Sequence, residues 1–171
     1  MKIVLTGPES VGKSTLAKQL AKEYNGEYVE EIARSYVEKL NRPYNYEDVV
    51  NIVQYQLQQY DQCEKLEMNY FFDTYLIVSK VWFLHVYKKM PSWFEAAYKK
   101  RPVDLYLLCK DDLEWEADGV RENENIRSLL FHSYQHELDN YGFNYRIVEG
   151  KGAERLINAK ALIEEYKKIN I

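Results

Sequence analysis

The chain has few cysteines and no excess of basic charge. Its two cysteines, Cys63 and Cys109, are too few for a disulfide framework, and no Cys-x-x-Cys pair or Cys/His cluster suggests a zinc site. We expect both to be small buried apolar residues in a protein of the reducing cytoplasm. With 23 basic and 27 acidic residues the net charge is −4. Nucleic-acid-binding domains usually carry a basic excess, so no nucleic-acid partner is expected.

The sequence also lacks a long uninterrupted hydrophobic run. The N-terminal segment 1–6 is too short for the apolar region of a signal peptide. The most apolar stretch, residues 70–87, is interrupted by Asp73, Lys80 and His85. A membrane-spanning helix needs about 20 predominantly apolar residues, so we expect a buried strand followed by a buried helix and no membrane partner.

What the chain contains is an alternation of short β-prone apolar runs with helical patterns. Its 171 residues suit one α/β domain, residues 1–171, and leave little room for a second. Such alternation predicts a parallel sheet with helices on both faces. The expected strands are 2–6, 27–30, 70–72, 103–109 and 143–148, and the expected helices are 14–24, 33–40, 46–67, 76–89, 126–141 and 153–169.

A phosphate-binding motif follows the first expected strand. The run Gly7-Pro8-Glu9-Ser10-Val11-Gly12-Lys13-Ser14 matches G-x-x-x-x-G-K-[ST] and leads into an amphipathic helix. Glycines let the backbone wrap so that successive N–H groups face one concavity, and the helix N-terminus adds partial positive charge. We predict that this P-loop binds the phosphates of ATP with Mg²⁺. The expected ATP-binding residues are Gly7, Glu9, Ser10, Val11, Gly12, Lys13, Ser14 and Thr15.

Within this motif three side chains have separate expected roles. The Lys13 ammonium lies beside the β- and γ-phosphates, the Ser14 hydroxyl is a ligand of Mg²⁺, and Thr15 donates to the α-phosphate. A GTPase would add an N/T-K-x-D tetrad, which the sequence lacks, and a large ATPase would usually be longer. A short P-loop chain with acidic residues at strand ends favours a nucleotide or nucleoside kinase.

Acidic residues follow two of the expected strands. In an open α/β sheet the ligand crevice lies at the carboxyl ends of the strands. Asp73 can therefore hold a water of Mg²⁺ or a substrate hydroxyl, although it could also cap the next helix. Glu30 or Glu31 could accept the proton of an attacking hydroxyl, and Arg34 could bind a phosphate or a hydroxyl. A surface ion pair between Glu31 and Arg34 is equally open, as is the choice of Glu31 or Asp73 as the general base.

An acidic segment in the second half of the chain is predicted to be a loop. It covers residues 111–125, with Gly119 as a flexible point and Arg121 and Arg127 as arginines that could stabilise transferring charge. Closure of such a loop would exclude water and suppress hydrolysis of ATP. The alternative is a solvated surface loop.

These segments together resemble one family, the ribosylnicotinamide kinase domain of bacterial NAD-biosynthesis regulators and its stand-alone relatives. The resemblance covers nearly the whole chain. The P-loop alone is unspecific, whereas the combination of the other motifs, in this order, is much more specific. They are Glu31-Ile32-Ala33-Arg34, Gln56-Leu57, Phe72-Asp73-Thr74, Trp115 and Asp118-Gly119-Val120-Arg121.

The resemblance implies a P-loop NTPase fold with a five-stranded parallel sheet ordered 2-3-1-4-5 and a lid at about 111–127. It implies transfer of the γ-phosphate of ATP to the 5′-hydroxyl of nicotinamide riboside, which gives nicotinamide mononucleotide. Gln56 would pair with the carboxamide and an aromatic residue such as Trp82 would contact the ring. The implied residues are catalytic Lys13, Glu31, Asp73 and Arg121; substrate-binding Glu31, Arg34, Tyr36, Gln56, Asp73 and Trp82; lid residues Trp115, Asp118, Gly119 and Arg127; and Arg121 and Arg155 at ATP, Arg155 near adenine.

One residue departs from the family pattern. Tyr75 stands where a second Asp usually follows Asp73-Thr74. Its phenol could replace the carboxylate as a hydrogen-bond partner, or the loss of charge could open the site to neutral nucleosides. A kinase of another nucleoside-like compound and a non-enzymatic ATP-binding regulator therefore remain as alternatives.

Overall fold

Five parallel strands form one sheet at the centre of the computed structural model, which describes residues 1–63, 67–116 and 124–170. The strand order is β2-β3-β1-β4-β5, which confirms the predicted order 2-3-1-4-5. Every pairing in the sheet is parallel. The strands are β1 (Lys2–Thr6), β2 (Glu27–Val29), β3 (Tyr70–Asp73), β4 (Leu105–Cys109) and β5 (Tyr145–Val148).

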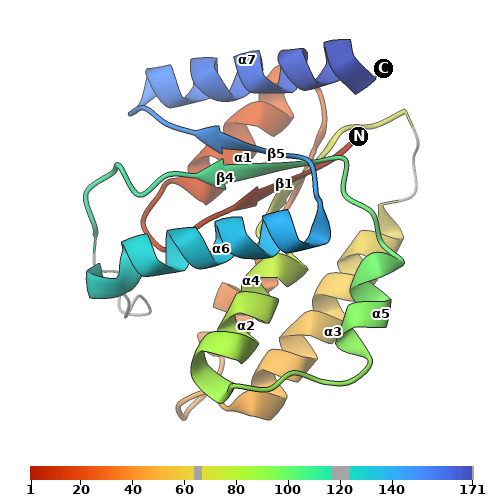
Figure 1. Cartoon of the computed structure of the whole chain (residues 1–171), viewed down its shortest axis with the longest axis vertical. Helices are drawn as coiled ribbons and strands as arrows, with labels where there is room; N and C mark the ends of the chain where they lie inside the picture. The colour runs from red at the N-terminus through yellow and green to blue at the C-terminus, as the bar shows by residue number, and fades with distance from the viewer. Residues whose placement is uncertain (64–66, 117–123, 171) are drawn as a thin grey trace.

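Helices cover both faces of the sheet (Figure 1). One face carries α1 (Lys13–Glu23) and α7 (Ala153–Asn170), and the other carries α3 (Tyr46–Gln62), α4 (Leu76–Trp82) and α6 (Arg127–Tyr141). No helix in the described part of the chain is both long enough and apolar enough to cross a membrane. The shorter helices are α2 (Ile32–Val37), the π-helical turn η1 (Phe83–Tyr87), α5 (Phe94–Lys99) and the 3₁₀ turn η2 (Glu124–Ile126).

Each central strand contributes side chains to two separate cores. In β1, Ile3 and Leu5 pack with α1 and α7, whereas Val4 packs with the helices of the opposite face. In β3, Phe71 and Phe72 are divided in the same way. A parallel strand buried on both faces needs apolar residues at every position, which is why these strands read as continuous apolar runs.

Several expected helices differ from those observed. The expected helix 33–40 ends at Val37, and α5 is not among the expected helices. The expected helix 76–89 changes after Trp82 into the π-helical turn η1 and ends at Lys88, whose backbone is left-handed (φ 54°). The wider turn buries Phe83 and leaves Leu84 and Val86 exposed. The expected helix 46–67 begins at Tyr46 and its helical part ends at Gln62, while residues 64–66 lie outside the described residues.

Tyr75 belongs to the core and cannot serve as the hydrogen-bond partner of a substrate. Its side chain is 1% exposed, and its ring stacks on that of Tyr60 with centroids 5.5 Å apart. The rings of Phe72 and Tyr98 also pack against it. Its hydroxyl has no hydrogen-bond partner among the described residues, and burial raises the pKa of the phenol. The interpretation in which the Tyr75 phenol replaces the missing carboxylate as a hydrogen-bond partner is therefore wrong.

We predict that Tyr75→Phe leaves the free energy of unfolding unchanged or raises it by up to about 1 kcal/mol, because it removes a buried polar group without a partner. Denaturant unfolding measures this. Tyr60→Phe is the matched control: its hydroxyl donates to the Pro102 carbonyl at 2.6 Å. That control should lose about 1 kcal/mol. A clear loss in Tyr75→Phe, equal to that of the control, would show that the Tyr75 hydroxyl has a partner.

Candidate functional site

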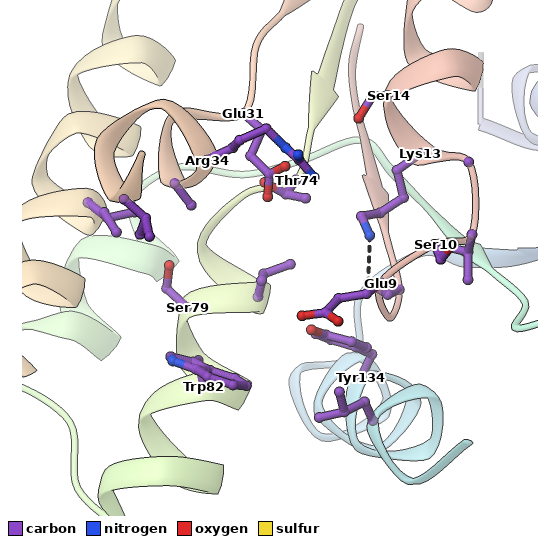
Figure 2. Close-up of a pocket in the computed structure, with 18 of the residues that line it drawn as sticks. Glu9, Ser10, Lys13, Ser14, Glu31, Arg34, Thr74, Ser79, Trp82 and Tyr134 are labelled. Carbon is purple, nitrogen blue, oxygen red and sulfur yellow. Dashed lines mark hydrogen bonds between the residues drawn. The ribbon is translucent and has the colours of Figure 1, made fainter. Parts of the chain in front are cut away.

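The loop between β1 and α1 is held in a tight left-handed path. Gly7, Ser10 and Gly12 have φ angles of 131°, 57° and 73°. A Cβ atom on Gly7 would lie 2.6 Å from the carbonyl oxygen of Cys109, at the end of β4. Lys13 folds back over this loop (Figure 2). Its Nζ donates to the carbonyl oxygens of Gly7 at 3.1 Å and Pro8 at 2.6 Å.

A cavity of about 300 Å³ begins at this loop and extends between α2, α3, α4 and α6. Figure 2 shows Lys13, Ser14 and Glu9 on the loop side, with Tyr134 next to Glu9. It shows Glu31 and Arg34 across from Lys13, and Trp82 further from the loop. The cavity thus joins a phosphate-binding loop to a region of apolar and aromatic side chains. Of the predicted site residues, those that line it are Gly7, Glu9, Ser10, Val11, Gly12, Lys13, Ser14, Thr15, Glu31, Arg34 and Trp82.

Glu31 lies across the cavity from Lys13, close enough for the two charges to interact (Figure 2). It precedes α2 as its N-cap residue, so the end of β2 and the start of the helix fix its position. Burial raises the pKa of Glu31, and the nearby charge of Asp73 raises it further, while Lys13 and Arg34 oppose the shift. A carboxyl group in such surroundings suits proton transfer, because its pKa is moved toward the working range of a general base. Glu30, the other candidate, is exposed.

Asp73 ends β3 in a buried position. It is 2% exposed, and its Oδ2 accepts a hydrogen bond from the Tyr28 hydroxyl at 3.1 Å. Its Oδ1 is buried and has no hydrogen-bond partner in the described part of the chain. Asp73 is not among the residues that line the cavity, although the next residue, Thr74, is.

The Ser14 hydroxyl and the Asp73 carboxylate fit a magnesium ion better than a metal that needs many protein ligands. Within residues 1–63, 67–116 and 124–170 no group of three or more His, Cys, Asp or Glu side chains could hold a metal. Mg²⁺ usually keeps several waters and takes one or two protein oxygens together with substrate phosphates. An unpartnered buried carboxylate oxygen is the kind of group that such a water can satisfy.

Sequence reasoning missed several residues that line the cavity, and three of them have polar or aromatic side chains that matter for its shape. Tyr44, Ser79 and Tyr134 all line it. The rings of Tyr44 and Trp82 lie 6.3 Å apart, so they form one aromatic wall. Tyr134 carried a weak signal, because it shares a helix face with Leu130, which also lines the cavity. No sequence signal marks Ser79.

Three predicted residues make contacts away from the cavity lining. Gln56 is 3% exposed, and its Oε1 accepts from the Ser79 hydroxyl at 3.0 Å, so it reaches the cavity only through Ser79. The Tyr36 hydroxyl donates to Asp48, the capping carboxylate of α3. Arg155 is 4% exposed and donates to Asp112 and to the carbonyl oxygens of Gly150 and Lys110.

Arg127 and Trp115, two of the expected lid residues, lie near the P-loop. Arg127 donates to the carbonyl oxygens of Leu113 at 2.9 Å and Ser10 at 3.4 Å. The Ser10 hydroxyl also accepts from the backbone N–H of Glu116 and donates to the Glu114 carbonyl. The indole nitrogen of Trp115 is buried without a partner in the described residues. Asp118, Gly119 and Arg121 lie outside them, so their lid and catalytic roles stay predictions.

The sheet, the P-loop and the cavity define a P-loop protein with the fold of nucleoside and nucleotide kinases. Residues 2–155 match the family described as AAA domain, and the chain belongs to that family.

Solved structures with the same fold include two NadR proteins. The one in complex with NR has a TM-score of 0.80 and 23% identity over 99% of this chain and 52% of that chain. The one in complex with NAD and AMP-PNP has a TM-score of 0.77 and 21% identity over 99% and 50%. The chain therefore spans about half the length of these NadR chains. The resemblance stated above is confirmed at the level of the fold.

Shorter kinases share the fold over their whole length. A deoxyadenosine kinase from M. mycoides has a TM-score of 0.68 and 15% identity over 96% of this chain and 100% of its own. A thymidylate kinase from Ehrlichia chaffeensis has a TM-score of 0.67 and 11% identity over 95% and 98%.

We predict that Gly7→Ala destabilises the protein by at least about 3 kcal/mol, because its Cβ would meet the Cys109 carbonyl and its backbone favours glycine. Gly142→Ala is the matched control. Its backbone is also left-handed (φ 64°), but nothing lies within 4 Å of the added Cβ. The control should lose only about 1–2 kcal/mol in thermal or denaturant unfolding. Equal losses would mean that the approach of Gly7 to β4 has no consequence.

Proposed function

We propose that this chain is an ATP-dependent kinase that phosphorylates the 5′-hydroxyl of nicotinamide riboside and so forms nicotinamide mononucleotide. The observation that carries the proposal is the continuous cavity between the P-loop and the aromatic wall of Tyr44 and Trp82. Two substrates held side by side can react directly, because their encounter and orientation are already provided. The NR and the AMP-PNP of the NadR complexes support the acceptor and the donor.

The P-loop side of the cavity, here called the donor half, binds and orients the triphosphate of ATP. Backbone N–H groups of the P-loop face the phosphates, and the Lys13 ammonium exchanges its backbone carbonyl partners for phosphate oxygens. Ser14 and Asp73 would hold Mg²⁺, which when bound neutralises charge that develops on the transferred group.

The side of the cavity with Glu31, Tyr44 and Trp82, here called the acceptor half, orients the 5′-hydroxyl of the riboside and takes up its proton. Glu31 is the proposed general base, since it lies across the cavity from Lys13 and its carboxylate can accept the 5′-hydroxyl proton. Two acidic side chains, Glu9 and Glu31, and two basic ones, Lys13 and Arg34, line the cavity. With Lys13 bound to the phosphates, the two carboxylates outnumber the remaining cation, which favours a cationic pyridinium ring over a neutral base. Trp82 and Tyr44 offer aromatic faces to that ring, at about 0.5–2 kcal/mol per contact. Gln56 would act on the carboxamide through Ser79.

The test is transfer of labelled γ-phosphate to a panel of nicotinamide riboside, uridine, cytidine and adenosine. We expect kcat/KM to be at least tenfold higher for nicotinamide riboside, because a carboxylate about 4 Å from a cation contributes ~1–4 kcal/mol. Preference for a neutral nucleoside would leave a kinase with a different acceptor. ATP binding without transfer to any of the four would favour a non-enzymatic module.

Lys13→Ala and Lys22→Ala serve as the paired variants for the same assay. Removal of a preorganised charge-stabilising donor typically lowers the rate by ~10²–10³, so Lys13→Ala should lose most of the transfer. Lys22 lies in the last turn of the same helix and is exposed, so its variant should keep the parent rate. A folded Lys13→Ala protein with near-normal turnover would refute the P-loop mechanism.

We predict that kcat of the parent protein falls at low pH, because the base must be ionised and the pKa of Glu31 lies above the usual glutamate range. In Glu31→Gln this acid limb of the pH profile of kcat should disappear. The raised pKa of Glu31 in the folded state also determines whether stability rises or falls with pH. Between the unfolded pKa near 4.5 and the folded pKa, the folded state binds more protons, so parent stability falls as pH rises.

Glu31→Gln should therefore be more stable than the parent protein at neutral pH and much less active. Glu30→Gln, which changes the exposed neighbouring carboxylate, should alter neither property. Thermal unfolding and initial rates at several pH values measure both effects. An unchanged acid limb in Glu31→Gln would assign the base to another group.

A further inference from the structure

Tyr28 joins the edge strand β2 to the buried carboxylate at the end of β3. Its hydroxyl is 3.1 Å from Asp73 Oδ2, and its ring packs with the core beneath α1. The Lys18 ammonium lies 5.1 Å from the centre of that ring. Tyr28 and Lys18 thus flank the strand end on the face that α1 covers, the helix that also carries Ser14.

The two oxygens of the Asp73 carboxylate have different surroundings. Oδ2 accepts the Tyr28 hydrogen bond, whereas Oδ1 is buried with no hydrogen-bond partner in the described part of the chain. The Tyr28 phenol is the donor of this bond and Asp73 Oδ2 is the acceptor. One oxygen is therefore held, and the carboxylate cannot rotate without losing that bond.

We infer that Tyr28 is a positioning residue for magnesium: its hydroxyl fixes Asp73 Oδ2 and so leaves the buried Oδ1, unpartnered among the described residues, to accept a hydrogen bond from a water of the Mg²⁺–nucleotide complex at Ser14. This inference rests on the proposed function, since it takes Asp73 as the carboxylate that serves Mg²⁺. Hydrogen bonds to the carboxylates around a metal orient them, and removal of such a partner typically weakens metal affinity by about 10–100-fold.

The test is Tyr28→Phe, which keeps the ring and removes only the hydroxyl. Calorimetry measures the affinity for a non-hydrolysable ATP analogue at a series of Mg²⁺ concentrations and in EDTA. We expect unchanged affinity in EDTA and a Mg²⁺ concentration for half-maximal effect about tenfold higher than in the parent protein. A purely structural role of the hydroxyl would shift both affinities together.

Tyr24→Phe is the matched control for this substitution. The Tyr24 ring packs on Phe71 in the same core, and its hydroxyl donates to Glu164 at 2.9 Å, which does not line the cavity. It loses the same atom, so its Mg²⁺ dependence should equal that of the parent. An unchanged Mg²⁺ dependence in Tyr28→Phe overturns the inference.

A double-mutant comparison decides whether Tyr28 acts through Asp73. In an Asp73→Ala background, Tyr28→Phe should add no further change in Mg²⁺ dependence, whereas additive losses overturn the inference. If the parent protein binds the analogue without any effect of Mg²⁺, the proposed function fails and the inference with it. If the parent responds to Mg²⁺ and Tyr28→Phe responds equally, only the inference fails.

Discussion

The rest of the site depends on the close approach of the P-loop to β4, because this contact holds the loop at the carboxyl edge of the sheet. Gly7 comes so near that strand that an added Cβ would be 2.6 Å from the Cys109 carbonyl oxygen. Since the sheet is parallel, the same edge carries the carboxyl ends of β2 and β3. Asp73 is the last residue of β3, and Glu31 comes shortly after β2. The parallel sheet therefore brings the phosphate-binding loop and both carboxylates to the same edge.

Burial, together with opposing charges, then sets the pKa of Glu31 at this edge. Burial and Asp73 raise the pKa of Glu31, while Lys13 lowers it, and burial is the largest of these effects. A carboxylate kept in such a place costs stability in the folded protein, which is a common property of functional groups with shifted pKa values. Asp73 differs from Glu31 because the Tyr28 hydroxyl donates to it and restrains the orientation of its carboxylate.

The strands and the P-loop could be predicted from sequence because their signals are local: continuous apolar runs and a fixed glycine spacing. Contacts that depend on how elements are rotated could not. Gln56 faces Ser79 only because α3 and α4 pack in one particular way. Tyr75 is buried in the core directly after Thr74, whose backbone is left-handed (φ 68°), and no residue type in the sequence signals either feature. Arg155 binds Asp112 across 43 residues of sequence.

The central claim is that one cavity holds both substrates in position for direct transfer. A crystal structure with a non-hydrolysable ATP analogue, Mg²⁺ and nicotinamide riboside tests it most directly. The account predicts the γ-phosphate at Lys13, the riboside between Trp82 and Glu31, and its 5′-oxygen about 3–3.5 Å from the γ-phosphorus, the separation of a near-attack arrangement. A riboside bound outside this cavity, or a 5′-hydroxyl turned away from Glu31 and the γ-phosphate, would contradict it.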